Sequence, residues 1–539
     1  MLAFLSIYDF ADWIIRGVAV AAQTLVVGGV AYFLFTIPAL KPGSAEENVG
    51  RTSLRILFYS ALTLGFARLL LAGLLATFLI ASTDADIATA FSANAVILNL
   101  LAATAAFALA LAARRSSLAA GPLLLMSTVI VGAHAGMTHA ASRVDSSQTL
   151  PALEALHLFA LGAWIGGIPY FIVSLRLFGT RDQCAAVCAR FSIVSLVAVP
   201  TMIVTGVLMS IPYVGSLERL YQTNYGLLLG AKAALLAILL CLGGANFLAI
   251  RKLGRGGSAS LQSVPIFGET EVAVGLIAVL CAVALASSPL AADTSAARPT
   301  PGEIASQFEL APPRLAIPTQ PPSPNLNDRT SFEQAALPVA PAAETERSPL
   351  DIAWSETHHH YAALLVILTG MIALISQSGR MTFLTRHWPA LFLGLAVYLF
   401  IVADEDAWPL GETGFLASLA TPRIAQHKMM IAMVAGLALF EWRAQSIKSR
   451  SQWPSLAFPV IVAAASAFLL THYGHTGRKE EVLIEISHMP VALLGVIAAV
   501  ARWLELRLPP SSLSRAAAMT WPVVLVAAGA FLLLYRESV

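Results

Sequence analysis

The sequence predicts an all-α integral membrane protein, a polytopic bundle of about 14 transmembrane helices in two halves. Three observations predict this fold class. The chain has 539 residues, of which 57% are hydrophobic and 12% are charged, and no soluble domain of this length is so apolar. Apolar runs of roughly 20 residues, the length that spans a bilayer, recur along the chain. One proline-rich segment separates eight of these runs from the other six.

The apolar runs give the expected order of elements. A window of roughly 20 apolar residues marks each span, and charged or turn residues mark its ends. In the first half the spans are expected at 13–37, 54–80, 94–113, 118–138, 152–177, 190–212, 226–250 and 270–291. In the second half they are expected at 359–377, 388–403, 424–442, 455–472, 483–504 and 517–535.

The segment between the two halves has a different composition. It contains RPTPGEIASQFELAPPRLAIPTQPPSPN, and proline this dense removes backbone donors and disfavours helices and sheet ladders. We expect a mostly extended, disordered linker. The chain is therefore divided into an eight-helix domain at 1–291, a linker at 292–357 and a six-helix domain at 358–539.

Lysine and arginine predict the orientation in the membrane. They are concentrated in one alternate set of short loops, for example at Arg114, Arg115, Arg251 and Lys252, and such loops face the cytoplasm. With an even number of spans, both termini and the linker are expected outside the cytoplasm, and the chain is expected in the bacterial inner (plasma) membrane. The start, MLAFLSIYDFADWIIRG, has no basic n-region, so we expect no cleavable signal peptide.

The histidines are expected almost entirely at the outer face. Of the 11 histidines, all but His387 fall at predicted outer ends of spans. Histidine at a helix end can be a cap or an interfacial residue, but no packing rule places it on one side only. Because imidazole is the commonest metal-ligating side chain, we expect a metal site at this face.

Two groups of residues form the candidate metal ligands. The stretch GAHAGMTHAA and the span after it supply the first group, which is His134, Met137, His139 and His157. Thioether sulfur is a soft ligand that suits Cu(I), so histidine with methionine favours copper over other metals. The second group lies in the other half and is His427, Met430, His472, His475 and His488. A methionine stripe is also compatible with core packing.

Polar residues inside the predicted spans are further candidates. Arg68 lies near the middle of a span, where a charge is costly unless it is paired; it is either functional or paired with Gln23 or Asn99. Lys232 lies two turns inside its span and can extend toward the interface. Glu154 precedes His157 by three residues, shares its helix face, and is a candidate to orient the imidazole.

Two cysteines are a weaker candidate site. Cys184 and Cys188 stand four residues apart in QCAAVCARF, a stretch expected to be helical and cytoplasmic. Two thiolates at this spacing could receive Cu(I), although such a pair is also compatible with simple packing.

An ordered series of motifs resembles a known family. The series is LHLFALGAWIGGIPYF, ARFS, VTGVLMS, TNYGLLLGAKAALL and GGANFLAIRK. It resembles the membrane domain of the copper resistance D (CopD) family, over about 150–255 and plausibly over the whole first half. The later segment THYGHTGRKEEVLIEISHMPVALLGVIAAVARWLELRLP resembles C-terminal extensions of larger proteins of this group.

The resemblance implies an inner-membrane protein that handles periplasmic copper, either taking it up or conferring tolerance. Some relatives carry a copper-binding β-sandwich of the CopC type. This sequence has no strand-rich segment, so a separate periplasmic CopC-like carrier is the expected partner.

Two other functions stay open. Paired histidines can ligate haem b in a membrane electron-transfer protein, with His427, His472 and His488 as ligands. A copper sensor or assembly partner would bind copper without moving it. We find no Walker A or pump phosphorylation motif and no nucleophile–base arrangement, so no nucleotide partner and no enzyme activity are expected. The net charge of +2 gives no reason to expect a nucleic-acid partner.

Overall fold

The computed structural model is built from helices. It describes residues 2–39, 44–83, 85–114, 120–142, 149–178, 180–254, 262–294, 298–309, 311–318, 349–377, 382–404, 407–419, 422–446, 453–471 and 479–537. In these ranges the only β-type pairing is an isolated bridge between Ala407 and Thr413. The predicted all-α fold class is confirmed.

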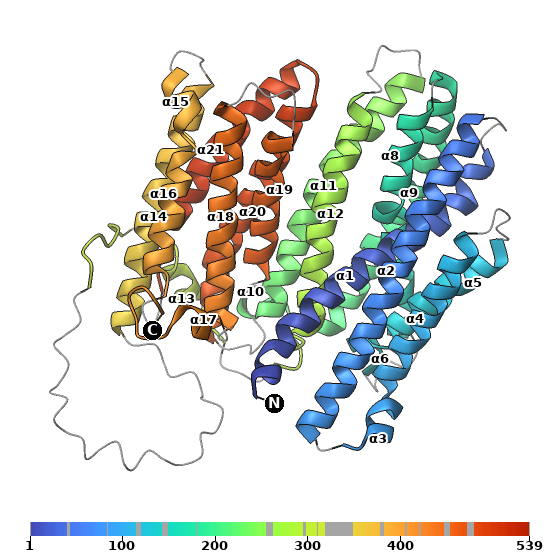
Figure 1. The fold of residues 1–539 in the computed structure, drawn as a ribbon, viewed down its shortest axis with the longest axis horizontal. Helices are drawn as coiled ribbons and strands as arrows, with labels where there is room; N and C mark the ends of the chain where they lie inside the picture. The colour runs from blue at the N-terminus through green and yellow to red at the C-terminus, as the bar shows by residue number, and fades with distance from the viewer. Residues whose placement is uncertain are drawn as a thin grey trace.

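The N-terminal half, residues 2–294, contributes long helices and several short connecting ones (Figure 1). Its elements are α1 (Leu2–Phe35), η1 (Ile37–Ala39), α2 (Ser44–Thr83), α3 (Ile87–Ser92), α4 (Asn94–Ala113), α5 (Ala120–Ala135), α6 (His139–Ser142), α7 (Thr149–Leu161), η3 (Gly162–Gly166), α8 (Ile168–Leu177), α9 (Arg181–Val214), α10 (Arg219–Gln222), α11 (Asn224–Gly254) and α12 (Ser263–Ser287).

The C-terminal half, residues 349–537, stands beside it as a second group of helices. Between the halves lies α13 (Pro301–Ser306). The remaining elements are α14 (Pro349–Ser376), α15 (Thr382–His387), α16 (Ala390–Val402), α17 (Phe415–Ser418), α18 (Pro422–Ser446), α19 (Trp453–Leu470), α20 (Lys479–Arg507) and α21 (Ser512–Leu533).

Each of the predicted apolar runs falls on a helix. Among the described residues, eleven helices are long and apolar enough to cross a membrane. Three runs form shorter apolar helices, Ala120–Ala135, Ala390–Val402 and Pro454–Leu470, so the total of 14 spans stays a prediction. Both labelled chain ends lie at the same end of the bundle (Figure 1), and we call this the termini end.

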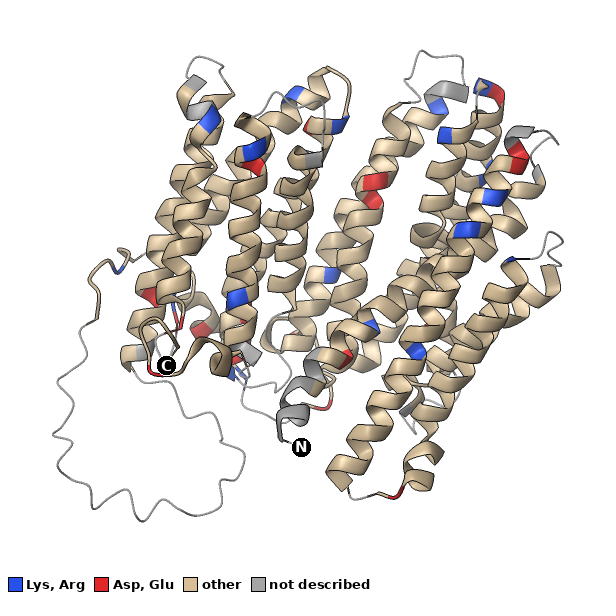
Figure 2. Ribbon diagram, in the orientation of Figure 1, with Lys and Arg blue, Asp and Glu red and all other residues tan. Residues whose placement is uncertain are grey.

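Charged side chains are mostly confined to the ends of the helices. Figure 2 shows lysine and arginine gathered at the end opposite the termini, with long uncharged stretches between. Large apolar side chains such as Leu70, Leu125 and Val197 are exposed on the outside, which suits lipid contact rather than water.

A close helix crossing lies at the centre of the N-terminal half. The chain from α7 to α8 passes through η3, a wide π turn, where α1 packs against it. A side chain added at Gly166 would place its Cβ 1.9 Å from the Thr24 carbonyl oxygen, and one at Gly28 would lie 2.0 Å from the Gly166 carbonyl carbon. The two backbones therefore touch, and only glycine fits at either position.

The two halves pack directly against each other. α11 and α12 contact α20, and α12 also contacts α19. Apolar side chains from both sides belong to one core, with Ala231 and Leu235 in the same cluster as Ala492 and Val496. Glu269 of α12 accepts hydrogen bonds from Arg507 Nη2 at 3.1 Å and from Trp503 Nε1 at 3.2 Å, both on α20.

Part of the expected linker is folded, which corrects the expectation of an extended segment there. Pro301 stands in the first turn of α13, where a missing N–H costs nothing, and Thr300 and Glu303 form a capping box. Further on, the Arg314 Nε lies 2.8 Å from Glu356 Oε2, and the Tyr361 hydroxyl donates to the Leu315 carbonyl at 2.7 Å. Residues 319–348 lie outside the described ranges.

Candidate metal-binding region

The histidines lie deeper in the helices than the sequence predicts. α7, α14 and α20 begin at Thr149, Pro349 and Lys479, so His157, His359 and His488 lie roughly two to three turns inside. The apolar windows omitted the first turns because these contain polar residues, yet such residues are good helix starters near the positive end of the dipole. The expected position at the first residues of the helices is therefore wrong for these three.

His134 belongs to a buried polar group that joins three helices. Its Nδ1 lies 3.0 Å from Gln23 Oε1 on α1, and Arg68 Nη2 on α2 donates to the same oxygen at 2.9 Å. Arg68 Nη1 reaches Asn99 Oδ1 on α4 at 3.4 Å. Because Gln23 Oε1 can only accept, His134 donates from Nδ1 and its lone pair is on Nε2. The expected partners of Arg68, Gln23 and Asn99, are both present.

His157 is held by a different helix from the one expected. Its Nδ1 lies 3.0 Å from Thr205 Oγ1 on α9. The Thr205 hydroxyl donates to the Thr201 carbonyl at 2.8 Å, so it accepts from the imidazole, which again leaves the lone pair on Nε2. Thr205, rather than Glu154, therefore fixes this ring. A Cβ added at Gly206 would lie 3.2 Å from the ring, so the glycine gives the imidazole room.

Glu154 instead lies within electrostatic range of Lys232 on α11, and Lys232 lies within range of His157. The charge of the lysine therefore acts on both Glu154 and His157. Met137 and His139 stand at the turn between α5 and α6, where the Met137 amide donates to the His134 carbonyl at 2.9 Å. Both side chains are partly buried.

In the C-terminal half, two histidines from different helices touch. The rings of His359 on α14 and His488 on α20 have centroids 5.6 Å apart at 87°. The Tyr535 ring contacts both, at 4.3 Å from His359 and 5.3 Å from His488. His359 was not among the predicted ligands. The run HHH at 358–360 was the available signal, but it does not say which of the three faces a neighbour.

Three other described histidines of this half have hydrogen-bond partners within the fold. His360 Nδ1 accepts the Arg314 amide at 2.9 Å, and its Nε2 lies 3.0 Å from the Tyr535 carbonyl. His358 Nδ1 pairs with the Tyr398 hydroxyl. His427 Nδ1 donates to Asp404 Oδ1 at 2.7 Å. Met430, three residues later on α18, is partly buried. His472 and His475 lie outside the described residues.

The cysteine pair is enclosed. Cys184 and Cys188 lie on the first turns of α9, are 6% and 0% exposed, and belong to the central core. This burial fits the interpretation as core residues better than that as an exposed copper acceptor.

The sequence analysis did not identify several buried acidic residues, among them Glu271 and Glu441. Glu271 on α12 is 4% exposed and accepts from Asn246 Nδ2 at 2.6 Å. Glu441 on α18 pairs with Arg502 Nη2 of α20 at 2.6 Å, and Arg502 Nη1 lies 2.7 Å from Glu505. An ionisable residue in an apolar span is the signal that could have identified each of them.

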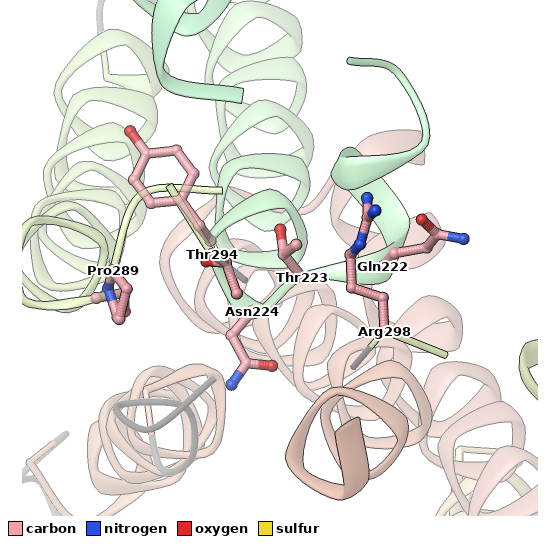
Figure 3. A pocket seen from close by; sticks show the side chains of 8 residues that line it. Gln222, Thr223, Asn224, Pro289, Thr294 and Arg298 are labelled. Atoms are coloured by element: carbon pink, nitrogen blue, oxygen red, sulfur yellow. The ribbon is translucent and has the colours of Figure 1, made fainter. Parts of the chain in front are cut away.

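No larger cation cage is preassembled. Among the described residues, no group of three or more His, Cys, Asp and Glu side chains is arranged to hold a metal ion. A pocket at the start of α11 has no histidine or methionine in its wall (Figure 3) and is lined by Gln222, Thr223, Asn224, Tyr225, Ser288, Pro289, Thr294 and Arg298. This pocket therefore contains none of the candidate histidine and methionine ligands.

Comparisons with known proteins match the last third of the N-terminal half to a known family. Residues 185–285 match the family model for copper resistance protein D. The copper transport protein CutJ of Bacillus subtilis (strain 168) is 30% identical over 141 residues, which are 25% of this chain and 25% of that relative. No solved structure is significantly similar to the chain. The resemblance to the CopD family is confirmed for this region, because residues 185–285 match the model of that family.

The matched segment supplies the partners of the histidines rather than the histidines themselves. It runs through α9, α11 and α12, and it contains Thr205, Lys232, Asn246 and Glu271 but no histidine. The family region thus forms the wall against which His157 is held.

Proposed function

We propose that the chain is a copper-handling membrane protein that collects copper at the termini end of the bundle and moves it across the membrane. The observation that carries the proposal is the contact between His157 and Thr205, because it brings a candidate ligand against the segment that matches the copper resistance family. Copper here is the cargo and not a resident cofactor.

In this proposal the first capture group is His134, Met137, His139 and His157. Imidazole and thioether suit copper, and the lone pairs of His134 and His157 lie on Nε2, the nitrogen left for a ligand. The positive charge of Arg68 disfavours the binding of a copper ion at His134. Lys232 does the same beside His157, but Glu154 offsets its charge, so His157 is the stronger ligand of the two.

The second group is His427, Met430, His472, His475 and His488, in the other half. Its described members lie on α18 and α20. The carboxylate of Asp404 behind His427 is the arrangement that orients and strengthens a ligating imidazole. A CopC-like carrier remains the expected donor of copper to these groups.

Haem b fits poorly at His359 and His488, the one pair of histidines whose rings touch among the described residues. Axial ligands approach iron from opposite sides of the macrocycle, which places the two ring centres about 6 Å apart on one line through the iron. His359 and His488 are closer, at 5.6 Å, and Tyr535 packs against both rings. No room for a porphyrin is left between them.

The test is copper movement in cells and copper content of the purified chain. Cells that express the chain should change their internal copper at fixed external copper: a rise indicates uptake and a fall indicates tolerance by export. His157→Ala should reduce this change by more than half, while His387→Ala, at the opposite end of the bundle, should not. Unchanged cell copper with copper bound to the purified chain would favour the sensor or assembly role instead.

A further inference from the structure

His359 and His488 are placed as a pair by three helices of the C-terminal half. α14 and α20 each pack against α21, and Tyr535, just after α21, has its ring against both imidazoles. The pair therefore lies where the first and the last helices of this half meet. Its residues are 129 positions apart in sequence (488 − 359).

The same kind of hydrogen bond fixes both rings. His359 Nδ1 lies 2.8 Å from the Ser355 carbonyl, and His488 Nδ1 lies 2.8 Å from the Ile484 carbonyl. Each carbonyl is one turn earlier on the histidine's own helix and can only accept. Both imidazoles are therefore protonated at Nδ1 and have their lone pair on Nε2, the state in which histidine binds a metal.

The separation of the rings suits one shared ion. With a metal–nitrogen distance of about 2 Å, each ring centre lies about 3 Å from the ion, so two imidazoles on one ion have centres at most about 6 Å apart. The observed separation of 5.6 Å lies within this limit.

The number of donors selects the ion. Zinc requires four ligands in structural sites and three protein ligands in catalytic ones, and the part of the chain that the structure describes provides no group of three His, Cys, Asp or Glu at one point. Cu(I) accepts two donors and binds imidazole.

We propose that His359 and His488 form a Cu(I) site in the C-terminal half, closed on one side by Tyr535 and separate from the His134 and His157 group. The proposal rests on the proposed function and adds a ligand, His359, and a coordination number of two protein nitrogens. It deepens the second capture group, to which His488 already belongs, in the half that lies outside the family match.

The experiment is a Cu(I) titration of the purified full chain in detergent, under anaerobic reducing conditions, against a chromophoric Cu(I) chelator. The chains compared are wild type, His359→Ala, His488→Ala, the double variant, and two matched controls, His157→Ala and His387→Ala. Each of the two single variants should lose one equivalent of copper or bind it at least about tenfold more weakly. The double variant should lose no more than either single variant, because one ion is shared. His387→Ala should bind as wild type does.

Other outcomes separate the two proposals. If wild type binds no Cu(I), the proposed function fails together with this site. If wild type binds Cu(I) and the His359 and His488 variants bind it equally well, only this site is overturned. Because alanine variants can misfold, X-ray absorption of wild type loaded with one equivalent provides a second measurement. Scattering from two imidazoles, unchanged in His157→Ala, supports the site, and scattering without imidazole overturns it.

Discussion

Each half of the bundle buries an arginine, and the two are accommodated by opposite means. In the N-terminal half, Arg68 faces neutral amide oxygens, Gln23 Oε1 at 2.9 Å and Asn99 Oδ1 at 3.4 Å. In the C-terminal half, Arg502 faces the carboxylates of Glu441 and Glu505 at 2.6 and 2.7 Å. It also lies over the rings of Phe458 and Trp521.

This difference changes the surroundings of the histidines. Amides solvate the charge of Arg68 but do not cancel it, so His134 shares its acceptor with a full positive charge. His427 in the other half instead faces the carboxylate of Asp404. A metal cation is therefore opposed near His134 and attracted near His427. The comparison indicates that a buried arginine opposes a cation at the first proposed copper group, whereas a carboxylate favours a cation at the second.

The largest effect is expected from breaking the charged pair. Glu441→Ala leaves Arg502 with only part of its countercharge in a buried position, and loss of one partner of such a pair costs about 3–5 kcal/mol. The thermal unfolding midpoint in detergent should fall accordingly. Glu441→Leu combined with Arg502→Met and Glu505→Gln removes all three charges; it is the matched control and should recover most of the loss. An unchanged midpoint in Glu441→Ala would mean that the pair does not support the fold.

A smaller effect is expected from the amide group. Gln23→Ala removes one acceptor shared by Arg68 and His134, which costs about 1–3 kcal/mol for a buried unsatisfied group. Gln23→Glu is the sharper variant, because it gives Arg68 a carboxylate and makes this half resemble the other. It should unfold at or above the wild-type temperature. If it unfolds lower than Gln23→Ala, the two halves cannot be interchanged in this way.

The smallest effect concerns the exposed contact between α13 and α20. Glu303 pairs with Lys479, and this partner, with the capping contacts of Thr300, lowers the pKa of Glu303 to about 2. A lowered pKa in the folded state stabilises the fold above the ordinary carboxyl pKa, and that contribution is lost as the pH falls toward about 2. The melting temperature of wild type should therefore decrease slightly more between about pH 5 and about pH 3 than that of Glu303→Gln. Glutamine keeps the cap and lacks the charge; equal slopes would contradict the expectation.

The sequence predicted the elements better than their contacts. Apolar windows located the helices, and the cost of an unpaired charge identified Gln23 and Asn99 as partners of Arg68. The sequence did not predict how far His157 and His488 lie from the start of their helices. Polar residues in the first turns lower the mean hydropathy there, so these turns resemble loops. His359 was missed as a ligand, and so was the pair Glu441–Arg502, because each partner lies on a helix distant in sequence. Helical periodicity gives the face of a residue but not the neighbour opposite.

The π turn at Gly162–Gly166 also determines which neighbouring helices the side chains of one long helix can contact. A π turn inserts about one extra residue into the α-helical repeat. Every side chain after the turn is therefore rotated about the helix axis by roughly 100° relative to an uninterrupted helix. Before the turn, His157 is directed to α9, where Thr205 holds it. After it, Tyr170 is directed to α1 and donates to the Leu25 carbonyl at 3.0 Å. The glycine-rich motif thus works as a phase shift, which lets one continuous helix present a candidate ligand to one neighbour and a structural anchor to another.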